Sequence, residues 1–111
     1  FYAARRFNQD ISSWDTSSVT SMRDMFRSNT VFNQNLGGWN ISSLTNASLM
    51  ISGAMSTANY DALLIGWAAQ APNIQSNVTL STGPQYTSAA TSARNVLTST
   101  YSWTITDGGL I

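Results

Sequence analysis

FNQDISSW, residues 7–14, recurs as FNQNLGGW at residues 32–39, so two closely similar phrases lie 25 residues apart. The match continues past the phrase, with identical or conservatively exchanged residues at the same shift as far as residue 51. A fixed period of this length is typical of a solenoid, in which each unit covers its apolar edge only against its neighbours. The repeat therefore predicts a stack of similar units.

The order of residues within one unit predicts a short strand followed by a short helix. The phrase at residues 7–14 resembles a strand bounded by polar turn residues. Residues 15–18 then offer several N-caps, and Val19, Met22, Met25 and Phe26 fall on one helical face. The expected fold class is α/β, a leucine-rich-repeat-like solenoid of short strand plus short helix.

The repeated apolar residues are expected to stack inside the solenoid. The expected contacts place Phe7, Ile11, Trp14, Met22 and Met25 on Phe32, Leu36, Trp39, Ala47 and Met50. The alternative for the two tryptophans is an exposed platform for sugars. Asn8 and Asn33 are expected to satisfy backbone groups at a turn, in preference to contacting a ligand.

The second half of the chain predicts a closing module rather than further repeats. Residues 56–71 predict a capped helix that ends before Pro72. Residues 87–99 predict a second helix with an inward face of Ala89, Ala93, Val96 and Leu97. Residues 77–81 and 102–106 alternate like strands. We therefore expect two full repeats with the tail of an earlier one in residues 1–55, and a helix-strand-helix-strand cap of the same domain in residues 56–111. Its expected core residues are Tyr60, Leu63, Leu64, Trp67, Trp103 and Ile105.

The composition excludes many kinds of chemistry. The charged residues are five arginines and five aspartates, and the chain has no Lys, Glu, His or Cys. A zinc site of the usual kind, a Ser–His or Cys–His nucleophile pair and a lysine Schiff base are therefore excluded. We expect that the protein is not an enzyme and that it has no catalytic, cofactor-binding or metal-binding residues. A net charge of zero argues against a nucleic-acid partner, and no apolar run is long enough to span a membrane.

A remote alternative is a carbohydrate-active enzyme that uses two aspartates as acid and base. Asp10 and Asp15 are the closest pair in the sequence. They flank a predicted strand and a corner, and nothing in the sequence predicts that either is buried.

The phrases FNQDISSWDTSSVTSMRDMF and FNQNLGGWNISSLTNASLM resemble the 25-residue repeats of BspA-like leucine-rich-repeat surface proteins, a repeat also found in a domain of mycoplasma lipoproteins. NYDALLIGWAAQ, residues 59–70, and WTITDGG, residues 103–109, resemble the cap that follows those repeats. The second repeat departs from the pattern at Gly37, Gly38 and Ala47. The resemblance implies an extracellular or cell-surface location in a bacterium, as part of a longer exported protein, and adhesion to a protein or glycan on another cell or matrix.

We therefore expect a non-enzymatic binding or adhesion module. The candidate contact residues are the positions not assigned to the core, namely Asp10, Ser12, Asn35 and Gly37. The alternative is a purely structural cap and spacer of a longer repeat array. The chain begins in mid-pattern, so the apolar edge near Phe1 and Phe7 is also expected to self-associate through residues 1–14.

Overall fold

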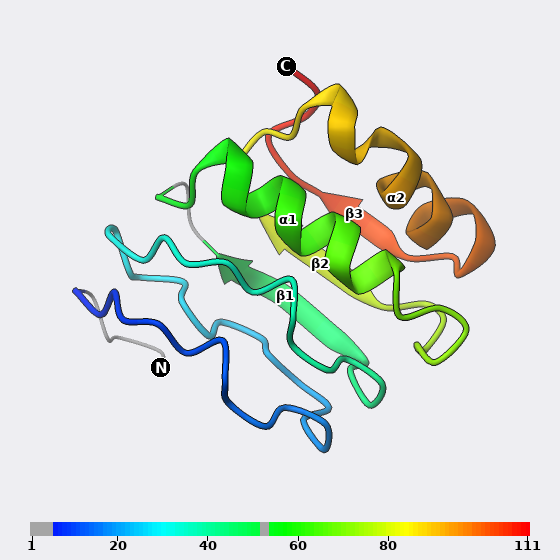
Figure 1. Ribbon diagram of the computed structural model, residues 1–111, viewed down its shortest axis with the longest axis horizontal. Helices are drawn as coiled ribbons and strands as arrows, with labels where there is room; N and C mark the ends of the chain where they lie inside the picture. The colour runs from blue at the N-terminus through cyan, green and yellow to red at the C-terminus, as the bar shows by residue number, and fades with distance from the viewer. Residues whose placement is uncertain (1–5, 52–53) are drawn as a thin grey trace.

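A computed structural model describes residues 6–51 and 54–111 as a mixed α/β fold built on a parallel sheet (Figure 1). The sheet has three strands in the order β1-β2-β3, and both helices lie on one face of it (Figure 1). A 3-10 turn precedes α2 and a π-helical turn follows it. The elements are β1 (Asn46–Ile51), α1 (Thr57–Ala68), β2 (Thr79–Thr82), α2 (Thr91–Asn95) and β3 (Thr104–Thr106). The α/β class predicted from the sequence is confirmed at this level.

The first half of the chain differs from the predicted order of strand and helix. Residues 7–14 form no strand and residues 19–26 form no helix. Instead, residues 21–26 run parallel to β1, bridged at Ser21 to Asn46 and at Phe26 to Ile51. The residues of each unit that were predicted to form a helix are therefore extended.

A left-handed residue in the strand explains why the sequence resembles a helix at this place. Leu49 in β1 has φ 53°, and the pairing of β1 with β2 is irregular between Ala47 and Ile51. The equivalent residue 25 positions earlier, Asp24, has φ 59°. An extra residue in a strand breaks the two-residue alternation. The buried residues Ala47, Met50 and Ile51 consequently follow the i, i+3, i+4 spacing of a helix.

Aromatic residues 25 positions apart stack face to face. The rings of Phe7 and Phe32 lie 6.3 Å apart at 13°, and those of Trp14 and Trp39 lie 6.4 Å apart at 8°. Trp39 is buried and its indole N–H donates to the Ile11 carbonyl at 2.9 Å. Trp14, however, is 41% exposed, so its assignment to the core is wrong. Because Trp39 is buried, no platform of two exposed tryptophans forms.

Most of the other predicted core residues do lie in one buried cluster. Its members from that set are Ile11, Met22, Phe32, Leu36, Trp39, Ala47, Met50, Tyr60, Leu63, Leu64, Trp67 and Trp103. Phe7, Met25 and Ile105 are partly buried and pack against this cluster. Phe1 lies outside the described residues.

The two repeated asparagines hold the outer segments of consecutive units together. The Asn8 side-chain oxygen accepts from the Asn33 backbone N–H at 2.9 Å. The Asn33 side-chain oxygen in turn accepts from the Ser56 backbone N–H at 2.8 Å. Each amide thus satisfies a backbone donor in the following unit, as the sequence predicts.

Helix α1 forms where the sequence predicts it. Ser56 caps it by accepting from the Asn59 backbone N–H at 3.2 Å. The buried face consists of Tyr60, Leu63, Leu64 and Trp67, the four residues that the helical spacing selects. The indole N–H of Trp67 donates to the Leu36 carbonyl at 3.0 Å, which fastens the helix to the preceding unit.

Two glycines allow α1 to lie directly against the segment that precedes it. A Cβ on Gly37 would lie 2.3 Å from the Ala62 carbonyl oxygen, and one on Gly66 would lie 2.1 Å from the Gly37 carbonyl oxygen. Both contacts are with backbone atoms, which cannot rotate away as a side chain can. Gly37 is therefore required for packing.

The substitution Gly37→Ala is expected to destabilise the protein by about 1–3 kcal/mol, because the added methyl must push α1 away from its neighbour. Gly38→Ala is the matched control, since a Cβ there meets nothing within 4 Å. Its effect should stay within about 0.5 kcal/mol. Urea denaturation of both variants measures the difference, and equal midpoints would contradict the close approach.

The 25-residue spacing returns in the second half, where sequence reading missed it. Strands β2 and β3 pair in register 25 residues apart, with Thr79 opposite Thr104 and Leu80 opposite Ile105. Left-handed residues precede both strands, Asn77 at φ 62° and Ser102 at φ 57°. The phrases VTLSTG, residues 78–83, and WTITDG, residues 103–108, correspond at this shift.

Candidate functional site

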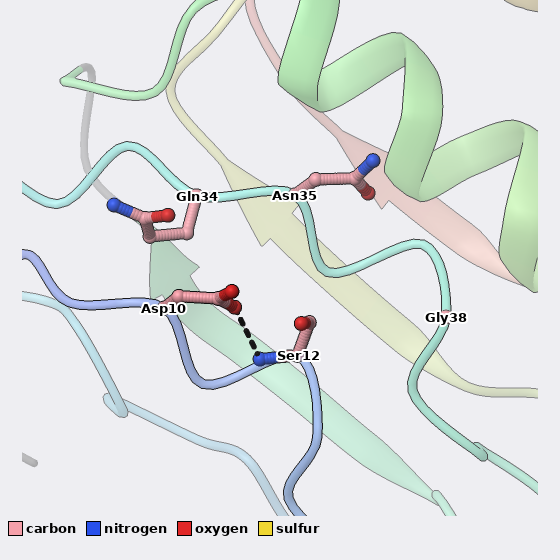
Figure 2. A pocket seen from close by; sticks show the side chains of 5 residues that line it. All are labelled: Asp10, Ser12, Gln34, Asn35 and Gly38. Carbon is pink, nitrogen blue, oxygen red and sulfur yellow. Dashed lines mark hydrogen bonds between the residues drawn. The ribbon is translucent and has the colours of Figure 1, made fainter.

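The outer segments of the first two units enclose an open polar hollow of about 320 Å³. The first segment contributes Asp10 and Ser12, and the second contributes Gln34, Asn35 and Gly38. Figure 2 shows the side chains of Asp10, Ser12 and Gln34 directed into the space between the segments. The segments lie beside α1, in the layer that covers the same face of the sheet as the helices (Figure 1).

Hydrogen bonds between the two segments hold Gln34 in place on one side of the hollow. The Asn8 side-chain oxygen accepts from the Gln34 side-chain amide at 2.8 Å, as well as from the Asn33 backbone. This bond leaves the Gln34 amide oxygen and the second N–H of the amide as the groups that the side chain can offer to a ligand. On the opposite wall, the Asp10 carboxylate accepts from the Ser12 backbone N–H at 2.9 Å, so the short turn orients the carboxylate.

The carboxylate of Asp10 is the charged group of the lining. The Ser12 hydroxyl and the Ser12 backbone N–H lower the pKa of Asp10 below the ordinary value for aspartate. Asp10 is therefore ionised at neutral pH and acts as an acceptor of hydrogen bonds. In the second segment, the Asn35 side-chain oxygen accepts from the Gly37 N–H at 2.8 Å, and the side chain is directed away from the hollow toward α1 (Figure 2).

The structure brings together three of the four candidate contact residues. Asp10, Ser12 and Asn35 line one hollow, although Asp10 and Asn35 are 25 positions apart. Gly37 does not line it and packs against α1 instead. Sequence reasoning missed Gln34 and Gly38. The recurrence of Gln9 as Gln34 in the repeated phrase was the available signal for Gln34.

The aspartate pair considered from the sequence is not assembled at the hollow, since Asp15 is not among the residues that line it. Asp15 instead forms its own turn, in which its carboxylate accepts from the Ser17 backbone N–H at 3.0 Å. Within residues 6–51 and 54–111, no group of three or more acidic, His or Cys side chains is placed to hold a metal ion. In that same part of the chain, no helix has the length and apolar character needed to cross a membrane.

A second polar cluster lies in the helical half and is structural in character. The Asp107 side chain is 2% exposed and pairs with Arg94, Nε to Oδ2, at 3.0 Å. The Tyr60 hydroxyl also donates to Asp107 at 2.7 Å, and burial raises the pKa of Tyr60, so it stays a donor. The cluster links α1, α2 and the end of β3, and its polar groups are engaged with each other.

Comparison with known proteins gives a family match. The model of the family described as Mycoplasma protein of unknown function, DUF285, matches residues 1–81. That range includes the repeated phrases, the hollow, α1 and most of β2. Searches of curated proteins and of solved structures found no match.

Proposed function

The chain belongs to the family described as Mycoplasma protein of unknown function, DUF285, and from that premise we propose that it is a non-enzymatic binding and adhesion module of a bacterial cell-surface protein. The proposed partner is a protein or glycan on another cell or on the matrix. The module acts outside the cell, as part of a longer exported protein.

The stacking of residues 25 positions apart supports the finer assignment to BspA-like leucine-rich-repeat solenoids. Phe7 stacks on Phe32 and Trp14 on Trp39, and the left-handed strand residue recurs as Asp24 and Leu49. Repeats of this kind expose an extended surface with similar chemistry in each unit. Such a surface suits recognition by many weak contacts.

The observation that supports binding most directly is that Asp10, Ser12 and Gln34, from two segments, direct their side chains into one hollow (Figure 2). These residues are held by the main-chain turns and inter-unit hydrogen bonds described above, so their side chains are oriented before a ligand arrives. Pre-organisation lowers the entropic cost of binding.

Two alternatives are compatible with the same fold. A purely structural cap and spacer would use the packing of α1 and leave the hollow without a ligand. A carbohydrate-active enzyme would need a second carboxylate about 5–10 Å from the first, and the residues that line the hollow include Asp10 alone among acidic side chains.

The binding proposal is tested by filling the hollow. Gly38→Leu adds a side chain where a Cβ meets nothing within 4 Å, so the fold should be retained. The chain and this variant are screened against one panel of immobilised glycans and extracellular-matrix proteins. We expect the panel to show binding that Gly38→Leu reduces about tenfold or more, because the leucine occupies the space of the ligand.

Ser13→Leu is the matched control, since Ser13 is exposed and does not line the hollow. This variant should bind like the unaltered chain. Binding that both variants lose equally would assign contact to another surface. A panel without any bound member would favour the structural cap.

A further inference from the structure

The hollow has more hydrogen-bond acceptors than donors, and this imbalance limits the class of ligand. Asp10 offers an ionised carboxylate, and one of its oxygens is already engaged by Ser12. Gln34 offers its amide oxygen and one N–H, because its other N–H donates to Asn8. Ser12 offers its hydroxyl oxygen as an acceptor, since its O–H is directed to Asp10. The walls are therefore rich in acceptors, with neutral groups around one charge.

A neutral hydroxyl-bearing ligand matches this set better than an ion does. An anion is repelled by the Asp10 carboxylate. A cation gains little from a single carboxylate that is open to solvent. A hydroxyl group donates to a carboxylate or an amide oxygen and accepts from an amide nitrogen. Neighbouring hydroxyls on one sugar ring can meet several of these groups together.

The same groups do not form a second site between the second unit and α1. The residue equivalent to Ser12 is Gly37, and α1 lies against it. The side-chain oxygen of Asn33, equivalent to that of Asn8, accepts from the Asn59 side-chain amide of α1 at 2.8 Å. Helix α1 therefore occupies the place that a ligand would take one unit further along.

From this geometry we infer that the hollow is a single subsite for a neutral sugar residue with adjacent free hydroxyls. The inference rests on the proposed function and names the ligand class of the same site. The Asp10 carboxylate accepts from the hydroxyls, and Gln34 and Ser12 complete the contact.

The test is a titration of the ¹⁵N-labelled chain followed by amide chemical shifts, with methyl α-mannoside, methyl β-galactoside and methyl β-glucoside as probes. N-acetylneuraminic acid is the anionic comparison, and the amides of Nα-acetyl-lysine and Nα-acetyl-arginine are the cationic ones. We expect at least one neutral glycoside to shift the amides around Ser12, Asn35 and Gly38 with a stoichiometry of one. Added salt should leave this binding unchanged, because the ligand is uncharged.

Asp10→Asn isolates the charge, because an asparagine at the equivalent position 35 makes the same turn. The variant should bind the glycoside roughly tenfold more weakly, since a hydrogen bond to an ionised acceptor becomes one to a neutral amide. Asp15→Asn is the control, because Asp15 forms a similar turn with Ser17 outside the hollow. It should change the affinity less than twofold.

Shifts produced only by the two cationic amides, and suppressed by salt, would overturn the sugar assignment in favour of a basic protein partner. So would the absence of shifts with every glycoside when Gly38→Leu still abolishes binding to a panel protein. Both results keep the proposed binding function. The binding function fails if no panel member binds the chain, and in that case the sugar inference fails with it.

Discussion

Trp67→Ala is expected to lower the free energy of unfolding by about 3–5 kcal/mol, the range for truncation of a fully buried aromatic side chain. Trp67 is 0% exposed and meets Trp103 edge-on, with the ring centroids 6.3 Å apart. Its removal leaves a cavity between α1 and the sheet. It also leaves the buried Leu36 carbonyl without the indole donor that lies 3.0 Å away. Urea denaturation followed by circular dichroism measures the loss.

Trp67→Phe is the milder variant that still tests the prediction if the alanine variant does not fold. It keeps most of the buried area and removes only the N–H donor, so a smaller loss of about 1–3 kcal/mol is expected. Trp14→Ala is the positional control, because Trp14 is the partly exposed member of the stacked pair. A loss for Trp14→Ala as large as that for Trp67→Ala would contradict the central role of α1.

The second large effect is expected at the buried ion pair of Arg94 and Asp107. Arg94→Met leaves the Asp107 carboxylate in a nearly dry site, and breaking such a pair typically costs about 3–5 kcal/mol. Burial lowers the pKa of Arg94, but the hydrogen bond and charge of Asp107, together with the nearby Tyr86 and Tyr60, raise it above the ordinary value, so the guanidinium stays charged. The loss should lie at the lower end of the range, because the Arg94 side chain is 21% exposed.

A double-mutant cycle separates the pair from the packing of the arginine stem. Asp107→Asn combined with Arg94→Met removes the uncompensated charge and should recover part of the stability. Arg27→Met is the surface control, because its contact with Asp24 is 3.7 Å long and its side chain is 52% exposed. Its effect should be about 0–1 kcal/mol. Equal losses for Arg27→Met and Arg94→Met would contradict the view that burial decides the strength of the pair.

The helical half was predictable because its signals are local. A capping serine at position 56 and four apolar residues at helical spacing suffice to place α1 and to select its buried face. The second helix was placed correctly in outline, but its face was not. Leu97 was expected inside and is buried, but Ala89 and Val96 were also expected inside and are exposed, and the buried Ala90 was missed. The change from 3-10 to α to π turns rotates successive side chains differently from a uniform helix.

The strand positions in the first half were not predictable from periodicity, because a left-handed residue at Asp24 and Leu49 disguises the strands as helices. Which residues stack was predictable from the repeat, since equivalent residues of adjacent units must meet. The candidate site followed partly from the same logic, because polar positions outside the core must face solvent. Gly37 was misjudged, since the sequence does not show that α1 lies directly on that glycine.

Several side-chain hydrogen bonds between units run from a donor later in the chain to a carbonyl earlier in the chain. The indoles of Trp39 and Trp67 donate to carbonyls 28 and 31 residues earlier. Ser43 and Gln75 likewise donate to carbonyls of earlier segments. The backbone bonds between the first two units run the other way, because the Met22, Asp24 and Phe26 N–H groups donate to the Asn46, Ser48 and Met50 carbonyls. Opening either unit therefore leaves hydrogen-bond partners unpaired in its neighbour, and opening α1 in addition removes the buried indole donor of Trp67 from the Leu36 carbonyl. Local opening should therefore be most costly around α1, and the helical half holds the preceding unit in place.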